Sequence, residues 1–302
     1  MFELNLYEIE AELRAVFPSL IIPSPLLLIG SGFNSIVLEA GGSIIFRIGK
    51  NSLAQEGYEK EIDCLSIIAP RIPFLVPIPK WHSKRSTYFP FGVIGYDKIP
   101  GIPLQPTLLN NTNLSLVARN TAKFLLALHQ LSPDSLQLKQ LIDQASKWED
   151  QHQNVLPILK SELIVTEFNQ IKQWWDHFLA DKKMQDYNPV IQHGDLWYEN
   201  MLVNTRVDKL IGIIDWEQLS IGDPAQDFAT LFHAGEKFVK FVIDSYQSLG
   251  GKLDENFEYR MQRLWEAREF EGLYYAIKFD DPIELKDALR KLRHGPILRK
   301  IL

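Results

Sequence analysis

Short apolar stretches dominate the first hundred residues of the chain. Three of them, LLLIG, SIVLEA and SIIFRI, have the length and β-branched content of strands, and Gly41-Gly42 between the last two is typical of a tight hairpin. FGVIGYDKI predicts another strand, and the proline- and glycine-rich PGIPLQP after it has the composition of a hinge. Apolar positions at helical spacing predict helices over 4–16 and 53–69.

After residue 100, helical spacing replaces these short stretches. It predicts helices in five segments: 113–131, 135–147, 157–181, 225–249 and 256–277. Among them, two short runs, NMLVN and LIGIIDW, have the character of strands. A β-rich first third followed by a mainly helical remainder predicts two lobes, residues 1–99 and 100–302.

The charge of the chain narrows its partners. There are 32 Lys and Arg against 38 Asp and Glu, a net charge of −6, which argues against general binding of nucleic acid. Most of the excess lies in residues 101–302, where the net charge is −5. An acidic larger part suits a cationic small molecule, although an ordinary solvated acidic surface is the more common explanation.

The remaining composition points to an ordinary globular protein. The single cysteine, Cys64, excludes an internal disulfide and is predicted to pack as a small apolar residue in the second helix. The N-terminal MFELNLYEIEAEL lacks the basic region of a signal peptide, and no apolar run approaches the roughly 18 residues of a membrane span. We therefore predict a soluble cytoplasmic protein that binds neither nucleic acid nor membrane.

One segment, HGDLWYEN, concentrates polar and charged side chains within an apolar frame. Four residues separate Asp195 from Asn200, and Asp215 follows the apolar run LIGII. Phosphoryl transfer uses such a set: one carboxylate takes the proton of the attacking hydroxyl, while an amide oxygen and a second carboxylate hold the Mg²⁺ that bridges the nucleotide phosphates. Each residue alone is explained as well by a turn or a strand end, but together they have the spacing of a kinase catalytic loop.

HGDLWYEN followed by GIIDWEQLSIGDPAQDFA resembles the aminoglycoside phosphotransferase family, whose members are small-molecule kinases with a protein-kinase-like fold. The resemblance covers most of the chain and is strongest over Gln192–Leu231. It implies an α+β bilobal fold, with a β-rich N-terminal lobe for the nucleotide and a mainly helical C-terminal lobe for catalysis and the acceptor. It also implies that Asp195 is the catalytic aspartate and that Asn200 and Asp215 are the Mg²⁺ ligands.

Three further polar residues of this region have structural roles by the same resemblance. His193 is expected to brace the catalytic loop. Asp223 precedes Pro224, which predicts an N-cap followed by proline at the first helical position. Asp227 is expected to tie that helix to the catalytic loop.

IGSGFNSIV lies between two predicted strands, where the family has its nucleotide loop. Gly30 and Gly32 would let the backbone approach phosphates, and Ser31, Asn34 and Ser35 would add hydrogen-bond donors. The segment departs from the pattern G-x-G-x-x-G because Ser35 stands in place of the last glycine. Taken alone, the segment is better explained as a plain hairpin turn.

The lysine that anchors phosphates in kinases is replaced by Arg47 in SIIFRIG. Arginine keeps the charge and can grip a phosphate with two N–H groups, but its shape differs. Its expected partner is Glu61, which falls in the apolar stripe of the second helix and needs a cation there; Lys50 is a second candidate phosphate contact. In GYDKIPG, the backbone of Asp97 and Ile99 would face the nucleotide base, which leaves ATP and GTP undistinguished.

Acceptor contacts are expected in the second lobe. Glu266 and Glu269 share a helix face away from the predicted core residues, and in the aminoglycoside enzymes acidic residues of this lobe receive ammonium groups. Trp197, Tyr198 and Glu199 are further candidates, with the two rings as a wall for a sugar. A solvated helix face for the acids and core packing for the rings are the alternatives.

The sequence thus predicts a Mg²⁺-dependent small-molecule kinase. It would transfer the γ-phosphoryl group of ATP or GTP to a hydroxyl of a cationic acceptor, with an aminoglycoside antibiotic as the leading candidate. Such an enzyme would confer antibiotic resistance, and we expect it to be a monomer. Macrolides, sugars, amino alcohols and homoserine are alternative acceptors. A nucleotide-binding pseudokinase is another alternative, motivated by Arg47 and the altered glycine loop, but the intact Asp195, Asn200 and Asp215 favour an enzyme.

Overall fold

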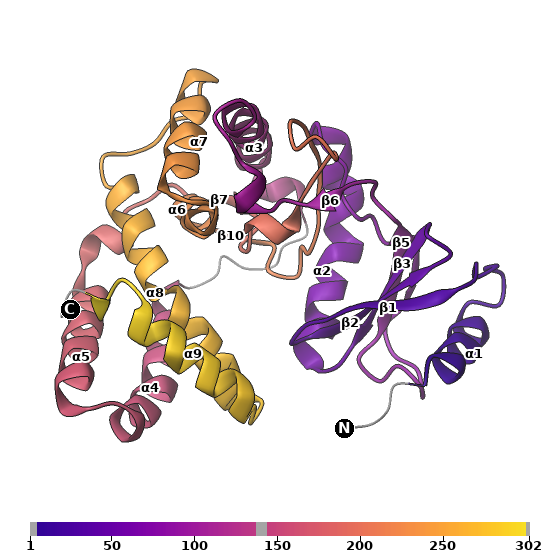
Figure 1. Cartoon of the computed structure of the whole chain (residues 1–302), viewed down its shortest axis with the longest axis horizontal. Coiled ribbons are helices and arrows are strands. Elements are labelled where there is room, and N and C mark those ends of the chain that lie inside the picture. Colours follow the sequence, from indigo (N-terminus) through magenta and orange to yellow (C-terminus); the bar gives the residue numbers. More distant parts are fainter. Residues whose placement is uncertain (1–4, 137–143, 300–302) are drawn as a thin grey trace.

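The computed structural model describes residues 5–136 and 144–299. Figure 1 shows two parts: a twisted sheet with helices α1 (Leu6–Val16) and α2 (Ser52–Ile68) at the right, and a larger, mainly helical part at the left. The change from one part to the other comes after strand β5 (Val93–Asp97), near the predicted hinge.

Five antiparallel strands form the N-terminal sheet, in the order β1-β2-β3-β5-β4. They are β1 (Leu26–Ser31), β2 (Ser35–Ala40), β3 (Ile44–Gly49), β4 (Trp81–Ser83) and β5 (Val93–Asp97). The predicted hairpin between β2 and β3 is confirmed, and Gly41 and Gly42 take φ values of 54° and 72°, which glycine adopts without strain. The sequence pattern does not predict β4, which is only three residues long.

Adjacent residues of β3 face opposite sides of the sheet, as strand geometry requires. Phe46 lies in a core cluster with Leu13 of α1 and Leu38 of β2. Arg47 faces the other side, where it meets Glu61 of α2. The sheet therefore separates an apolar core under α1 from a charged side chain directed at α2.

Two small sheets of the C-terminal part carry the polar motifs. One has the order β6-β8-β9 and the other pairs β10 with β7. The strands are β6 (Ile102–Pro103), β7 (Val190–Gln192), β8 (Met201–Val203), β9 (Leu210–Ile213) and β10 (Ser220–Gly222). The two predicted strand-like runs are confirmed as β8 and β9. Hydrogen bonds from Leu75 N–H to Ile211 (3.0 Å) and from Ile213 N–H to Leu75 (2.9 Å) also attach β9 to the proline-rich segment of the N-terminal part.

Helices make up most of the C-terminal part. They are α3 (Leu114–His129), α4 (Gln144–Glu162), α5 (Val165–Ala180), α6 (Ala225–Ala229), α7 (Glu236–Ser248), α8 (Phe257–Lys278) and α9 (Pro282–His294). Trp174, Trp175 and Phe178 of α5 pack their rings against Phe270 of α8 or against each other, with centroids 4.7–5.8 Å apart. Within the described ranges, no helix has both the length and the apolar character needed to cross a membrane.

Several predicted helix boundaries are wrong. The helix predicted to start at Pro157 is continuous with the preceding turns, because Val155 and Leu159 on either side of the proline are fully buried in α4. The helix predicted over 225–249 is broken into α6, a 3₁₀ turn and α7, where Gly235 takes a φ of 99°. Much of the helix predicted over 135–147 lies outside the described residues. The sequence pattern also fails to predict α9. The prediction that Cys64 is buried is confirmed.

Candidate active site

The catalytic loop predicted in HGDLWYEN connects β7 to β8. Gly194 has a φ of 85°, and a Cβ there would lie 2.5 Å from the carbonyl oxygen of Gln218, so no larger residue fits without a shift. A 3₁₀ turn over Tyr198–Asn200 then leads into β8. The loop is thereby folded against the segment that follows β9.

Asp227 of α6 holds this loop through its backbone. Its fully buried carboxylate accepts hydrogen bonds from the N–H groups of His193 (3.0 Å) and Gly194 (2.8 Å) and pairs with Nε2 of His129 (3.2 Å). The expected tie between this helix and the catalytic loop is therefore present in the structure.

His193 is buried in its neutral form. Its Nε2–H donates to the carbonyl oxygen of Ile214 (3.1 Å), and its Nδ1 accepts from the N–H of Asp195 (3.3 Å). Burial lowers the pKa of His193 to about 4, although Asp227 opposes the shift. Both ring nitrogens are engaged, so the side chain joins the loop to the segment before Asp215 and has no nitrogen free for proton transfer.

Asp195 lies at the open side of the loop. Its side chain is 26% exposed, Oδ2 lies 3.4 Å from Nδ2 of Asn200, and Oδ1 lies 3.7 Å from Nη2 of Arg268 in α8. Burial raises the pKa of Asp195 to about 7, and Arg268 opposes the shift. A carboxylate that titrates near neutral pH is suited to accept the proton of a hydroxyl.

Asn200 and Asp215 are brought together by the pairing of β8 with β9. The carbonyl oxygen of Asn200 accepts from the N–H of Ile214, directly before Asp215, at 3.0 Å. The Nδ2 of Asn200 donates to the carbonyl oxygen of Asp195 (2.9 Å), so its amide oxygen remains available, and the Asp215 side chain is 47% exposed. An amide and a carboxylate oxygen fit Mg²⁺, whose other ligands come from phosphates and water. Among the described residues, no cluster of three or more His, Cys, Asp or Glu is arranged to hold a metal ion.

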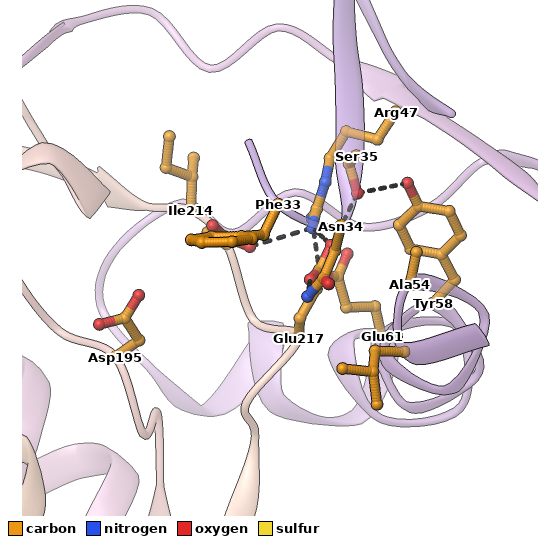
Figure 2. A network of polar contacts seen from close by, with 12 residues as sticks. Phe33, Asn34, Ser35, Arg47, Ala54, Tyr58, Glu61, Asp195, Ile214 and Glu217 are labelled. Atoms are coloured by element: carbon orange, nitrogen blue, oxygen red, sulfur yellow. Dashed lines mark hydrogen bonds and ion pairs between the residues drawn. The ribbon is translucent and has the colours of Figure 1, made fainter. Parts of the chain in front are cut away.

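Arg47 is the centre of the charged network in Figure 2. In Figure 2 its buried guanidinium donates to Glu61 (2.7 Å) and to Glu217. It also donates to Asp215 (3.0 Å). The predicted pair of Arg47 and Glu61 is therefore present. Burial acts to lower the pKa of Arg47, but the three carboxylates together raise it well above its usual value, so the guanidinium stays charged.

Glu217 is a residue of the site that the sequence analysis misses. Besides Arg47, its carboxylate accepts hydrogen bonds from Nδ2 of Asn34 and from the hydroxyl of Ser35, both at 2.9 Å (Figure 2). Helix α2 leaves room for it, because a Cβ on Gly57 would lie 2.8 Å from Cγ of Glu217. The signal in the sequence is weak: a second acid in DWE, with no indication of its partners.

The glycine loop is folded on itself. Gly30 and Ser31 end β1, the N–H of Gly32 donates to the carbonyl oxygen of Ser35 (2.9 Å), and Nζ of Lys50 donates to the carbonyl oxygen of Gly32 (2.7 Å). Lys50 is therefore engaged with the loop backbone in this state.

The tip of the glycine loop faces the C-terminal part. The ring of Phe33 lies 6.3 Å from that of Tyr275 in α8. A cleft of about 580 Å³ opens beside this tip. It is lined by Ser31, Gly32, Phe33, Lys50, Asn51, Phe279, Asp281 and Glu284. The cleft thus lies between the glycine loop and the segment where α8 ends and α9 begins.

The predicted base-binding connector leaves the sheet at the end of β5. Asp97 is its last strand residue and Ile99 is buried, while the N–H of Lys98 between them donates to the carbonyl oxygen of Ser43 (2.8 Å). The carboxylate of Asp97 pairs with Lys80 at the surface. The connector is thus anchored to the hairpin side of the sheet.

Residues 26–290 match the model of the phosphotransferase enzyme family. The chain belongs to this family. The match runs from β1 into α9, so it includes the catalytic loop, the glycine loop and the charged network. The predicted enzyme class, a phosphotransferase, is confirmed.

Individual relatives of this phosphotransferase agree with the assignment. Viomycin phosphotransferase of Streptomyces vinaceus is 26% identical over 202 residues, which cover 65% of this chain and 68% of that enzyme. The GDP and kanamycin complex of APH(2″)-IIIa superposes with a TM-score of 0.84 at 20% identity, over 95% of this chain and 97% of the other. Macrolide 2′-phosphotransferase type I superposes with a TM-score of 0.71 at 18% identity, over 97% and 99%. The predicted bilobal, protein-kinase-like fold is confirmed.

Trp197 and Tyr198, the two aromatic residues predicted to contact the acceptor of this phosphotransferase, pack against neighbouring rings. The rings of Trp197 and Tyr198 lie 4.9 Å apart, and both contact the ring of His233, at 6.0 and 6.5 Å. Each is half-buried, whereas Glu199 is exposed. The two rings therefore take part in packing and remain partly exposed.

The prediction that Glu266 lies on a helix face away from the core is wrong. Glu266 is 6% exposed, and its carboxylate accepts hydrogen bonds from Nε1 of Trp174 (2.9 Å) and from Arg263 (2.6 Å). Glu269 is half-buried, and burial raises its pKa. Glu271, which the sequence analysis did not single out as an acceptor contact, is the acid of α8 that acts on Asp195.

The N-cap predicted at Asp223 is displaced by one residue, because α6 begins at Ala225 with Pro224 as its N-cap. The carboxylate of Asp223 nevertheless accepts from the N–H of Ala225 (3.0 Å) and forms a buried ion pair with Arg260 of α8 (2.7 Å). Asp223 therefore ties α6, which carries Asp227, to α8.

Proposed function

We propose that this phosphotransferase transfers the γ-phosphoryl group of ATP or GTP to a hydroxyl of an aminoglycoside. The observation that carries the proposal is the placement of one open carboxylate, Asp195, in a rigid loop beside Asn200 and Asp215. The family assignment supports the reaction class.

Asp195 acts as the general base. It accepts the proton of the acceptor hydroxyl while the hydroxyl oxygen forms a bond to the γ-phosphorus, and the bond to the bridging oxygen breaks to release the nucleoside diphosphate. His193 stays neutral and keeps the loop in place. The side chains required come from a single chain, which is compatible with a monomer.

Asn200 and Asp215 are the proposed ligands of Mg²⁺, and Glu217, two residues further along, is an additional candidate. When bound, Mg²⁺ supplies positive charge against the nucleotide phosphates. Arg47 pairs with Asp215 and Glu217 in this structure, so we expect that pairing to rearrange when the metal binds.

The nucleotide binds between the glycine loop and the connector after β5. The backbone of Gly30, Ser31 and Gly32 and the side chains of Asn34, Ser35 and Arg47 meet the phosphates, while the backbone at Asp97 and Ile99 meets the base. Backbone groups bond adenine and guanine alike, so ATP and GTP both belong to the proposal.

The acceptor is proposed to be an aminoglycoside because acids gather on its side of the site. Asp281 and Glu284 line the cleft beside the glycine loop together with Lys50, and Glu271, which pairs with Lys147 (3.2 Å), lies near Asp195. Carboxylates at these places suit the ammonium groups of a polycation. The kanamycin complex of APH(2″)-IIIa and the viomycin phosphotransferase support such an acceptor, while the macrolide enzyme makes a macrolide the main competitor.

Release of nucleoside diphosphate tests the proposal. The purified chain is assayed with Mg²⁺ and ATP or GTP, alone and with a panel of aminoglycosides. We expect an aminoglycoside to stimulate release. Background hydrolysis that responds only to a macrolide, a sugar or an amino alcohol would replace the acceptor class, and no turnover with either nucleotide would favour the pseudokinase.

Asp195→Asn supplies the decisive variant. We expect turnover to fall by about 10²–10⁴-fold, the range typical of a general base, with nucleotide binding retained. Asp244→Asn, at an exposed position of α7, is the matched control. Full turnover in Asp195→Asn would remove Asp195 from the mechanism.

A further inference from the structure

One guanidinium of helix α8 faces the catalytic carboxylate. Nη2 of Arg268 lies 3.7 Å from Oδ1 of Asp195, within ion-pair range but beyond hydrogen-bond range. The other oxygen, Oδ2, lies 3.4 Å from Nδ2 of Asn200. The two oxygens of Asp195 are therefore steered by two different groups, one on α8 and one at the end of the catalytic loop.

Arg268 is held there by packing. Its guanidinium carbon lies 5.8 Å from the centre of the Trp197 ring, and 24% of its side chain is exposed. Its Nη1 is buried and has no hydrogen-bond partner among the residues that the structure describes. A buried donor without a partner is costly, so the position of Arg268 is not explained by its own hydrogen bonds.

Among the charged residues that act on Asp195, Arg268 differs from the others in the sign of its charge. Asp215, Glu271 and Asp227 act on Asp195 with its own sign, whereas Arg268 acts with the opposite sign. Like charges disfavour a fixed, inward orientation of the carboxylate, and an opposite charge at 3.7 Å favours it. Without Arg268, the carboxylate would be free to turn toward solvent or toward Asn200.

We propose that Arg268 is a positioning residue, which holds the Asp195 carboxylate in the orientation that meets the acceptor hydroxyl. The inference rests on the proposed function, because it takes Asp195 as the general base. Arginine suits this role, since its planar group lies on an aromatic ring while one nitrogen meets a carboxylate. Arg268 acts through Asp195.

Arg263 offers a matched control on the same helix. Its guanidinium also lies over a tryptophan, 4.6 Å from the ring centre of Trp174, and it also pairs with a carboxylate, Glu266, at 2.6 Å. This second pair belongs to the packing of α8 against α5 and includes no proposed catalytic group. Comparing Arg268 with Arg263 therefore separates positioning of Asp195 from the general stabilisation of α8.

Steady-state kinetics of R268M, R268K and R263M test the proposal. With an acceptor that the wild type phosphorylates, we expect R268M to lower kcat by about tenfold or more, an effect typical of a displaced catalytic group. KM for nucleotide and acceptor should change less than about twofold. R268K should recover part of kcat, because it restores the charge but not the planar group, and R263M should keep kcat while lowering the melting temperature.

Two kinetic results would overturn the proposal. One is a kcat of R268M within about twofold of the wild type. The other is a higher acceptor KM at unchanged kcat, which would make Arg268 a contact that binds ground state and transition state equally.

Crystal structures of R268M and R263M give a readout that needs no substrate. We expect the Asp195 side chain to change its rotamer in R268M and to keep it in R263M. An unchanged Asp195 in R268M would overturn the proposal whatever the wild type phosphorylates. A reoriented Asp195, together with a wild type that shows no acceptor-dependent turnover, would support the positioning and count against the proposed acceptor alone.

Discussion

The two loops that frame the active site are held in different ways. The catalytic loop is fixed from within the C-terminal lobe, where the fully buried carboxylate of Asp227 accepts hydrogen bonds from the backbone N–H groups of His193 and Gly194. The glycine loop is fixed from the opposite lobe, where Glu217, whose side chain is still 11% exposed, accepts hydrogen bonds from the side chains of Asn34 and Ser35.

Because of this difference, we expect the catalytic loop to keep its conformation, whereas the contacts of the glycine loop can be exchanged when a ligand binds. Buried backbone N–H groups with a carboxylate partner are released only by local unfolding. Hydrogen bonds between side chains at a carboxylate that still reaches solvent, as Glu217 does, can be exchanged for bonds to a ligand without unfolding the backbone. Because Glu217 also binds Arg47, which we propose to meet the phosphates, we expect nucleotide binding to rearrange the glycine loop and to leave the catalytic loop unchanged.

The largest effect is expected at the anchor of the catalytic loop. Asp227→Asn keeps the size of the side chain but turns an N–H group toward buried backbone donors. We expect the free energy of unfolding to fall by about 3–5 kcal/mol, measured by urea denaturation at pH 7. The exposed Asp244→Asn should change it by less than about 0.5 kcal/mol. A loss below about 1 kcal/mol in Asp227→Asn would break the comparison, because the loop would then not depend on this anchor.

Acid should weaken the catalytic loop through His193. The pKa of His193 is lowered to about 4 in the folded chain and is about 6.5 when unfolded, so the unfolded state binds its proton first as pH falls. Its contribution to stability is complete above about pH 6.5 and is lost progressively toward pH 4. Between pH 7 and 5 we expect a loss of about 2 kcal/mol from this residue.

The pH effect is measured as a difference between variants. Unfolding free energies of the wild type and His193→Gln at pH 7 and pH 5 isolate the histidine, because the raised pKa values of Asp195 and Glu61 act in both chains with the opposite sign. His82→Gln, at an exposed position, is the control. Equal pH dependence in the wild type and His193→Gln would contradict a buried, neutral His193.

Gly57→Ala sharpens the comparison on the side of the glycine loop. Alanine normally stabilises a helix interior relative to glycine by about 0.5–1 kcal/mol. At Gly57, however, the new Cβ would lie 2.8 Å from Cγ of Glu217 and must displace it, so we expect a net loss of about 1–3 kcal/mol in the unfolding free energy.

Gly272→Ala is the matched helix substitution. Its Cβ would meet neighbours only at 3.7 and 3.9 Å, so we expect the ordinary gain of about 0.5–1 kcal/mol. Equal gains at Gly57 and Gly272 would mean that Glu217 is not held against α2.

The smallest effect is expected at Ser35. Its hydroxyl donates to Glu217 (2.9 Å) and accepts from Tyr58 (2.7 Å), so Ser35→Ala should cost about 1 kcal/mol in unfolding free energy. Ser66→Ala, at an exposed position of α2, should cost less than about 0.5 kcal/mol. A loss in Ser35→Ala as large as that in Asp227→Asn would erase the distinction between the two loops.

Local patterns were enough for some features of the chain. The hairpin at Gly41-Gly42 and the strands β8 and β9 that follow the catalytic loop could be predicted from turn chemistry and from short apolar runs. The pair of Arg47 and Glu61 was predicted because a buried acid needs a cation. Where packing overrides local preference, the same reasoning failed: Pro157 lies inside α4, and the predicted surface acid Glu266 is buried against α5.

The sequence by itself determined the reaction class, because Asp195, Asn200 and Asp215 are close in the chain and their spacing is read directly. Only the tertiary structure decided which groups surround them. Glu217 meets Asn34, Ser35 and Arg47 across 183, 182 and 170 residues, and Arg268 meets Asp195 from a helix in another part of the chain. Periodicity shows which face of a helix is apolar, but not which loop a polar side chain will face. Packing of the two lobes decides that.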